Sequence, residues 1–144
     1  MILEDDTMSE NCIFCQIVNG EAPSTKVYED DDFIAIQSLF QSVKGHTLLI
    51  PKEHSDDITT MKPELGQKML ELIQKVGSAQ MKGLGADGFN VAVNTKRAAG
   101  QVIDHTHIHL LPRFKEDGMT LWKEHDVSEE DRVLYAEKII NGME

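Results

Sequence analysis

The sequence predicts a single α+β domain built from antiparallel strands and one long helix. Three observations predict this: short apolar runs separated by polar turns, a helical apolar repeat after Pro63, and two further strand-like runs behind it. The chain has 144 residues, 40% hydrophobic and 27% charged, which is enough to bury one core without disulfides. We expect residues 11–144 to form one domain and the acidic residues 1–10 a flexible tail.

The first half of the domain is expected to hold a short helix and a three-stranded meander. Apolar residues recur on one helical face near residue 13, and a glycine follows at the position of a C-terminal cap; these residues are Ile13, Phe14, Ile17 and Gly20. Three apolar or β-branched runs then predict strands at residues 26–29, 33–37 and 46–50. Short acidic and glycine-containing turns between them suit antiparallel pairing.

The second half is expected to hold the long helix, two more strands and a C-terminal helix. Pro63 opens a segment whose apolar face comprises Leu65, Met69, Leu72, Ile73 and Val76. Alternation predicts strands at 89–93 and 104–111, and Pro112 is expected to end the second of them. Ser128, followed by three acidic residues, predicts a capped helix whose Val133, Leu134 and Ile140 could dock near the end of the chain.

The charge balance excludes several classes of partner. Fourteen basic against 25 acidic residues give a formal charge of -11, which repels a phosphate backbone, so nucleic-acid binding is disfavoured. No apolar run approaches the roughly 18 residues that span a bilayer, and the first residues are acidic where a signal peptide is basic. We therefore expect a cytoplasmic protein with no membrane partner.

Three histidines at alternate positions carry the strongest chemical signal. In a strand, His105, His107 and His109 would share one face, with Ile108 and Leu110 pointing into the core. A metal-chelating or merely solvated histidine row is the alternative interpretation. Three imidazoles at strand spacing favour a site over that alternative.

A loop before the histidines has the composition of an anion-binding loop. Asn94 ends the preceding strand, and Gly100 and Gln101 precede the next one. Glycine permits close backbone approach to a phosphate and an amide side chain can donate to it, although the same pair also occurs in plain turns. The nearby histidines favour the phosphate interpretation.

Cys12 and Cys15 form a C-x2-C pair, which supplies half of a tetrahedral zinc site. A thioredoxin-like redox pair would follow a buried strand, whereas here only an acidic segment precedes it. A bare reduced pair is the remaining alternative to zinc.

The histidine row and two flanking segments resemble a known family. The run from His105 to Leu111, HTHIHLL, is similar to the His-φ-His-φ-His-φ-φ signature of histidine triad (HIT) proteins. CIFCQIVNGEAPSTKVYED at 12–30 and GHTLLIPKEH at 45–54 resemble the bacterial Hint-like branch, in the same order. The resemblance implies a HIT-like fold: a five-stranded antiparallel sheet with a long packed helix, a short N-terminal helix and a C-terminal helix. It also implies a homodimer formed through the long helix and neighbouring strands.

The resemblance implies covalent phosphoryl chemistry. His107 would attack the α-phosphorus of a nucleoside monophosphate derivative, and water would hydrolyse the nucleotidyl-histidine. His109 would contact the phosphate and leaving group, and His46 would support the cluster. The nucleotide contacts implied in the loop are Asn94, Gly100, Gln101, Val102 and Ile103. The zinc site would be structural, with Cys12, Cys15, His54 and His105 as ligands.

The base pocket implied by the resemblance has two departures from the family pattern. Ile13, Phe14, Ile17 and Leu39 match positions on which the base packs, although plain core is the equal alternative. Ser38 stands where many relatives have an acidic residue that bonds both ribose hydroxyls. Val102 stands where relatives usually have serine or threonine, which removes a hydroxyl near the phosphate.

These features predict a nucleotide-binding HIT hydrolase of the purine nucleoside phosphoramidase type. Its partner would be a purine nucleotide or a nucleotide conjugate. Two alternatives remain: a dinucleoside polyphosphate hydrolase, and a nucleotide-binding regulatory protein with little turnover.

Overall fold

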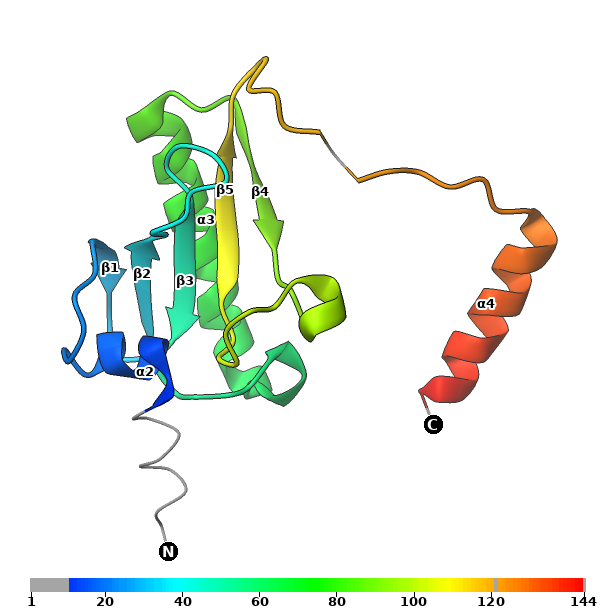
Figure 1. Ribbon diagram of the computed structural model, residues 1–144, viewed down its shortest axis with the longest axis horizontal. Helices are drawn as coiled ribbons and strands as arrows, with labels where there is room; N and C mark the ends of the chain where they lie inside the picture. The colour runs from blue at the N-terminus through cyan, green and yellow to red at the C-terminus, as the bar shows by residue number, and fades with distance from the viewer. Residues whose placement is uncertain (1–10, 121, 144) are drawn as a thin grey trace, which may run out of the picture.

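A five-stranded antiparallel sheet forms the centre of the molecule, as expected. The structure is a computed structural model and describes residues 11–120 and 122–143, so the predicted tail at residues 1–10 lies outside it. The strand order is β1-β2-β3-β5-β4, and all neighbours are antiparallel (Figure 1). The strands are β1 (Lys26–Glu29), β2 (Phe33–Gln37), β3 (Thr47–Pro51), β4 (Gly88–Ala92) and β5 (Ile108–Arg113).

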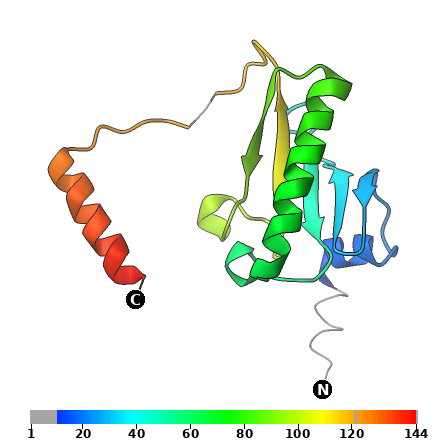
Figure 2. The same cartoon turned by 180° about the vertical axis from the view of Figure 1, so that it is seen from behind.

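Helices cover the two faces of this sheet unequally. The 19-residue α3 (Gly66–Leu84) runs along one face, as Figure 2 shows, and the six-residue α2 (Ile13–Val18) packs on the other. Single 3-10 turns lie at 58–60, 63–65 and 97–99, and α4 (Glu129–Gly142) follows the last strand. No helix within the described residues is both long and apolar enough to cross a membrane.

The central strands are buried on both faces because their residues alternate between two cores. On β2 and β3, Ile34, Ile36, Leu48 and Ile50 pack against the α2 side. Their neighbours Phe33, Ala35 and Leu49 pack with Leu72 and Val76 of α3. Since side chains alternate along a strand, Ile108 and Leu110 of β5 enter the α3 core and His109 between them faces the α2 side. His109 therefore lies on the α2 face of the sheet, which we call the chemical face.

The last strand differs from the sequence prediction at both ends. It begins at Ile108 rather than at residue 104, so His105 and His107 precede the strand and only His109 lies in it. Pro112 lies within β5 instead of ending it. Pairing with β3 covers only Ile108 to Leu110, so Pro112 has a strand neighbour on the β4 side alone.

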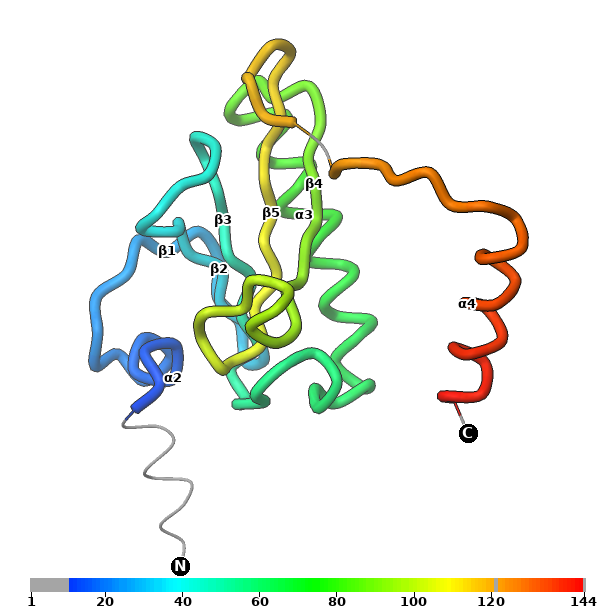
Figure 3. Tube along the Cα trace, turned by 45° about the vertical axis from the view of Figure 1, so that its right-hand side comes forward, coloured from blue at the N-terminus to red at the C-terminus, as the bar shows by residue number. Residues whose placement is uncertain are grey.

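The C-terminal helix forms as predicted, and its apolar side chains are exposed. The Ser128 hydroxyl accepts a hydrogen bond from the backbone N–H of Asp131, which caps α4. Val133, Leu134 and Ile140 are 54%, 43% and 56% exposed, and α4 buries no residue. Figures 1 and 3 both show α4 lying away from the sheet. Within the described part of the chain, these apolar side chains have no docking partner.

Gly77 allows α3 to approach the sheet closely. A Cβ atom at this position would lie 2.3 Å from Cζ of Phe89 on β4, and within 2.6 Å of two further ring atoms. Glycine inside a helix costs about 1 kcal/mol relative to alanine. Because the ring of Phe89 lies directly against the helix backbone, there is no room for a larger residue at position 77.

We predict that Gly77→Ala destabilises the protein although alanine is the better helix former. The clash with Phe89 should cost about 1–3 kcal/mol, a fall of several degrees in Tm. Gly83→Ala is the matched control, because nothing lies within 4 Å of a Cβ there, and it should raise stability by about 0.4–1 kcal/mol. Thermal and urea unfolding measure both; equal gains in the two variants would contradict the packing argument.

Candidate functional site

Three imidazoles, those of His107, His109 and His46, form a continuous cluster on the chemical face of the sheet. The ring centroids of His107 and His109 are 5.0 Å apart, and those of His109 and His46 are 5.1 Å apart. His105 lies on the other side of Phe14, whose ring meets both His105 and His107 edge-on at 5.8 and 5.0 Å. The histidines expected on one strand face are thus brought together by the strand and by the segment before it.

The hydrogen bonds of His107 define which of its nitrogens can react. Its Nδ1 lies 2.7 Å from the backbone oxygen of His105. A carbonyl oxygen can only accept, so Nδ1 carries the proton and Nε2 keeps its lone pair. His107 is 6% exposed, and burial lowers its pKa, which favours the neutral ring. Neutral imidazole with a lone pair at Nε2 is the nucleophilic form.

His46 and His109 form a second chain of hydrogen bonds that leaves one donor without a partner. The backbone N–H of Ser42 donates to His46 Nδ1 at 3.2 Å, so the proton of neutral His46 lies on Nε2. His46 Nε2 then donates to His109 Nδ1 at 2.9 Å. His109 must therefore carry its own proton on Nε2, which is buried and has no protein partner. An unpaired donor costs about 1–3 kcal/mol when desolvated, which marks a position for a ligand oxygen.

The histidine cluster is held neutral. Burial, followed by the repulsion of any charge on His107 and His46, lowers the pKa of His109 to about 4. Burial also lowers the pKa of His46, with a further contribution from charge on His107, while the Phe40 carbonyl acts in the opposite direction. At neutral pH the cluster is uncharged.

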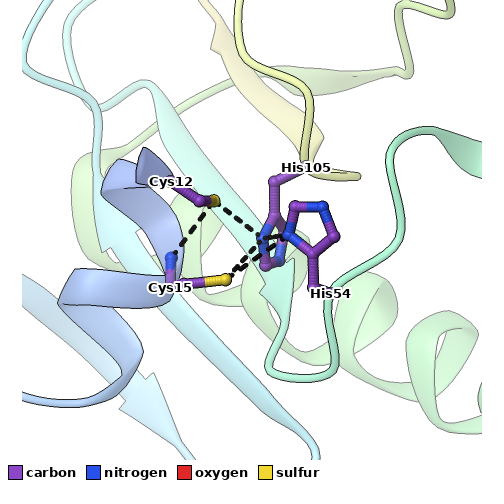
Figure 4. A group of neighbouring side chains, drawn as sticks. All are labelled: Cys12, Cys15, His54 and His105. Carbon is purple, nitrogen blue, oxygen red and sulfur yellow. Dashed lines mark hydrogen bonds between the residues drawn. The ribbon is translucent and has the colours of Figure 1, made fainter. Parts of the chain in front are cut away.

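A second cluster joins α2 to the segment before β5, and we call it the thiol cluster; its members are Cys12, Cys15, His54 and His105. Figure 4 shows Cys12 and Cys15 at the start of α2 converging on His54, which follows β3, and on His105. One ligand atom from each of these residues lies within 4.8 Å of the other three. Cys12 and Cys15 are buried and are not joined in a disulfide.

The donor set and its spacing fit a tetrahedral metal ion. The sulfur-to-nitrogen distances are 3.3 Å for Cys12–His105, 3.4 Å for Cys15–His54 and 3.6 Å for Cys15–His105. Zinc bonds of about 2.3 Å to sulfur and about 2.0 Å to nitrogen would place such atoms about 3.5 Å apart. Two thiolates with two imidazoles are a common structural zinc set.

The Nε2 atoms of His105 and His54 are both hydrogen-bonded to protein oxygens, and this orients the two Nδ1 atoms towards each other. His105 Nε2 donates to the Pro51 carbonyl at 2.8 Å, and His54 Nε2 donates to Asp56 at 2.9 Å. Their Nδ1 atoms therefore present lone pairs to each other at 3.1 Å. Two facing lone pairs repel unless a cation shares them, so this geometry suits a metal ion. Burial also lowers the pKa of His105 to about 4, so its ring is in the neutral form that ligation needs.

Four consecutive residues after β3 fasten the segment that leads to the histidines. His54 meets His105 in the thiol cluster, and the Ser55 carbonyl accepts from the Thr106 N–H at 2.8 Å. The remaining two contacts are from Gln101 Nε2 to the Asp56 carbonyl at 2.7 Å, and from Lys96 Nζ to Asp57 Oδ2 at 2.8 Å. We call residues 54–57 the fastening segment.

The loop at 94–103 is placed beside this segment, and one expectation about it needs correction. Gln101 is 2% exposed, and its amide donates to the carbonyls of Asp56 and Ile103 while its oxygen accepts from the N–H of Lys96. Both amide hydrogens are used, so the side chain braces the loop and does not donate to a phosphate. Asn94 Nδ2 reaches the Gly100 carbonyl at 3.5 Å, and Val102 is 75% exposed.

An apolar pocket of about 540 Å³ lies next to the histidines. Phe14, which contacts His107, lines it, as does Leu48, which pairs with His109 across β3 and β5. Each residue expected at the base or ribose site lines it, namely Ile13, Phe14, Ile17, Ser38 and Leu39; Ile103, which was expected in the phosphate loop, lines it as well. Leu39 and Phe40 are 92% and 87% exposed at its rim, so they are available to a ligand.

Sequence reasoning missed the roles of Asp57 and Lys96. The Lys96 ammonium, followed by hydrogen bonds from Thr59, lowers the pKa of Asp57 to about 2. Lys96 has φ 74 and ψ 162, a conformation that costs a non-glycine residue about 1–3 kcal/mol. The Asp57-x-Thr59 spacing, typical of a side chain that caps its own turn, was the one readable signal.

Histidine burial predicts a pH dependence of stability. His109 has a pKa of about 4 in the fold against 6.5 ordinarily, so the folded chain binds fewer protons between these values and its stability falls as pH is lowered through them. His109→Asn should lose less stability than wild type between pH 7 and pH 5 in urea unfolding. Identical slopes in wild type and His109→Asn would contradict the assignment.

Comparisons with known proteins agree with this geometry. The family model for the HIT domain matches residues 19–116. The chain is 40% identical over 120 residues to an Arabidopsis thaliana protein named adenylylsulfatase HINT3; the match covers 83% of this chain and 60% of that longer protein. It is 34% identical over 131 residues to the Schizosaccharomyces pombe protein named adenosine 5′-monophosphoramidase hnt1, covering 90% and 96% of the two chains.

A solved structure that is described as zinc-bound shares the fold. The zinc-bound histidine triad family protein of Mycobacterium smegmatis superposes with a TM-score of 0.74 at 38% identity, covering 94% of this chain and 99% of that one. The family match spans more than half of the chain, and the fold and the histidine cluster agree with it. The chain belongs to the histidine triad (HIT) family.

Proposed function

We propose that this protein hydrolyses purine nucleoside monophosphate derivatives, as a nucleoside phosphoramidase, through a nucleotidyl intermediate on His107. One observation carries the proposal: His107 presents a lone pair at Nε2, and the neighbouring His109 presents an N–H donor at Nε2 that has no protein partner. A nucleophile and a hydrogen-bond donor side by side are what in-line displacement at phosphorus requires. Relatives named as hydrolases of adenylyl compounds support the reaction class.

In the first step, His107 Nε2 forms a bond to the α-phosphorus while the bond to the leaving group breaks. The leaving group takes the electron pair and, where it is an amine, a proton from solvent water, which is balanced when the water that attacks in the second step loses a proton. The ring becomes positively charged, and the His105 carbonyl stabilises that charge by accepting from Nδ1–H. Water then attacks the same phosphorus, releases the nucleoside monophosphate and restores neutral His107.

His109 and His46 hold the phosphoryl group during both steps. His109 Nε2–H donates to a phosphoryl oxygen, where negative charge accumulates in the transition state. His46 keeps that proton on Nε2 by occupying His109 Nδ1. Asn94 and backbone groups around Gly100 complete the phosphate contacts, and the base occupies the apolar pocket.

We also propose that Cys12, Cys15, His54 and His105 hold one structural zinc ion. The four ligand atoms lie within 4.8 Å of one another, and both imidazoles are oriented by hydrogen bonds at their Nε2 atoms. Bound there, zinc supplies a cross-link between α2 and the segment before β5. Because His105 takes part, its carbonyl is held in place for His107.

The surface of the sheet edge supports a homodimer. β4 is an edge strand, and Val91 on it is 45% exposed. Leu70, Met81 and Leu84 of the adjacent α3 are exposed as well. An unpaired strand edge beside apolar side chains is a surface that a second copy can cover.

We predict that His107→Ala abolishes AMP release from adenosine 5′-phosphoramidate. Removing a covalent nucleophile should lower kcat by at least about 10³-fold while the fold, checked by its thermal melt, is retained. His125→Ala, which removes an exposed histidine, is the matched control and should keep wild-type turnover. Equal and negligible rates in wild type and His107→Ala would instead indicate a nucleotide-binding protein with little turnover.

We predict about one zinc ion per chain in protein purified without chelators. Because binding a metal stabilises only the folded chain, adding a chelator should lower Tm, and Cys15→Ser should abolish both the zinc content and this response. Elemental analysis and thermal melts measure this. A zinc-free wild type whose Tm ignores chelators contradicts the assignment.

We predict that the protein has twice the mass of one chain in light scattering at micromolar concentration. Val91→Lys places a charge on the β4 edge and should shift the protein towards monomers. Val27→Lys makes the same change on the opposite edge strand, β1, where Val27 is 48% exposed, and should leave the dimer intact. A monomeric wild type, or equal effects of both variants, contradicts this interface.

A further inference from the structure

A glutamine lies on the buried face of α3, among apolar residues. The buried residues of this helix follow the helical repeat and are Leu72, Val76, Gly77 and Gln80. Gln80 is 5% exposed, so its amide is almost completely removed from water. Burying an amide costs free energy unless its atoms are hydrogen-bonded. The partners of Gln80 therefore indicate what the side chain contributes.

The amide nitrogen of Gln80 lies beside three acceptors where the pairing of β3 with β5 ends. Nε2 donates to the Leu110 carbonyl at 3.1 Å, to Thr47 Oγ1 at 3.2 Å and to the Gly45 carbonyl at 3.3 Å. Because a carbonyl oxygen can only accept, the amide must turn its nitrogen, and not its oxygen, towards Gly45 and Leu110. The two amide hydrogens are shared among the three acceptors.

This orientation leaves the amide oxygen unpaired. Gln80 Oε1 is buried and has no hydrogen-bond partner within residues 11–120 and 122–143. A buried acceptor without a partner destabilises a fold, and an apolar side chain of similar length would avoid that cost. The contribution of Gln80 therefore lies in the bonds that its Nε2 donates.

The three acceptors are chain neighbours of two histidines of the cluster. Gly45 and Thr47 flank His46, and Leu110 directly follows His109. The imidazole of His109 faces the α2 side of the sheet, whereas Gln80 approaches from the α3 side. Gln80 thus bonds to the backbone around both histidines from the face opposite to their imidazole pair.

The backbone ladder between β3 and β5 stops one residue short of His46. Its last pair joins Thr47 to Leu110. The N–H and the carbonyl of His46 bond instead to Val43 and Ser38, both in the connection between β2 and β3. Gln80 extends the link between the two strands past the last backbone pair, as far as Gly45.

We propose that Gln80 is a positioning residue that holds His46 against His109 from the far face of the sheet. The contact that it maintains is the 2.9 Å hydrogen bond from His46 Nε2 to His109 Nδ1. Hydrogen bonds weaken steeply when their geometry is lost, so fraying at this strand end would loosen that bond. The consequence for catalysis rests on the proposed function, in which His109 donates to the phosphoryl group.

The test observes this hydrogen bond directly by NMR in Gln80→Met, which keeps a side chain of similar length and removes both donors. In 15N-labelled wild type we expect a proton on His46 Nε2 and a scalar coupling across the bond to His109 Nδ1. In Gln80→Met this coupling should fall to about half or less. The kcat for adenosine 5′-phosphoramidate should fall about tenfold, because small misplacements of a catalytic group are costly, while KM changes less.

Val76→Ala is the matched control, one turn earlier on the same face of α3. It removes apolar contacts from the α3 core and should lower Tm at least as much as Gln80→Met. It should leave the coupling and kcat at their wild-type values. Gln80→Glu keeps the shape of the side chain with at most one donor, and its coupling decides the inference if Gln80→Met does not fold.

The outcomes separate this inference from the proposed function. A coupling that is absent from wild type, stays at full strength in the folded Gln80 variant, or falls equally in Val76→Ala overturns the inference. A weakened coupling with unchanged kcat overturns the positioning role. If wild type does not cleave the substrate, the proposed function fails, and the coupling alone decides whether Gln80 holds the two histidines together.

Discussion

The hydrogen bond from His107 Nδ1 to the His105 carbonyl is the contact on which the chemistry depends. It fixes the tautomer of His107, holds its ring beside His109 and offers an acceptor for the charge that the ring would gain. His105 can supply that carbonyl because its own ring is held at two atoms, by Cys12 at Nδ1 and by Pro51 at Nε2. One residue thus belongs to both clusters, with its side chain in the thiol cluster and its backbone at the nucleophile.

The fastening segment makes that arrangement rigid without a strand ladder. His54, Ser55, Asp56 and Asp57 each hold one residue of the loop that leads to the histidines. Lys96 keeps a backbone conformation that is costly for a side chain, and its pairing with buried Asp57 offsets part of that cost. Backbone strain of this kind persists where surrounding contacts over-determine a functional loop.

The order of strands and helices could be predicted from the sequence because it follows from periodicity. Each predicted strand and helix forms, with small shifts at the ends. The predicted start of β5, at residue 104, was wrong for a physical reason. His105-Thr106-His107 has the alternation of a strand, but Thr106 forms hydrogen bonds with Ser55, which lies outside the sheet. Gln101 was misjudged because only the folded loop shows that three partners occupy its amide. The exposure of α4 could not be predicted either, because a sequence pattern shows which residues of a helix are apolar but not what they pack against.

The central claim is that His107 carries the nucleotide between two displacements. The direct measurement is rapid quenching of wild type with adenosine 5′-phosphoramidate under alkaline conditions, followed by peptide mapping in the mass spectrometer. The account predicts an adenylyl group on His107 that accumulates before steady state and is absent in His107→Ala. Turnover without any adenylylated peptide, or with the group on another residue, would contradict it.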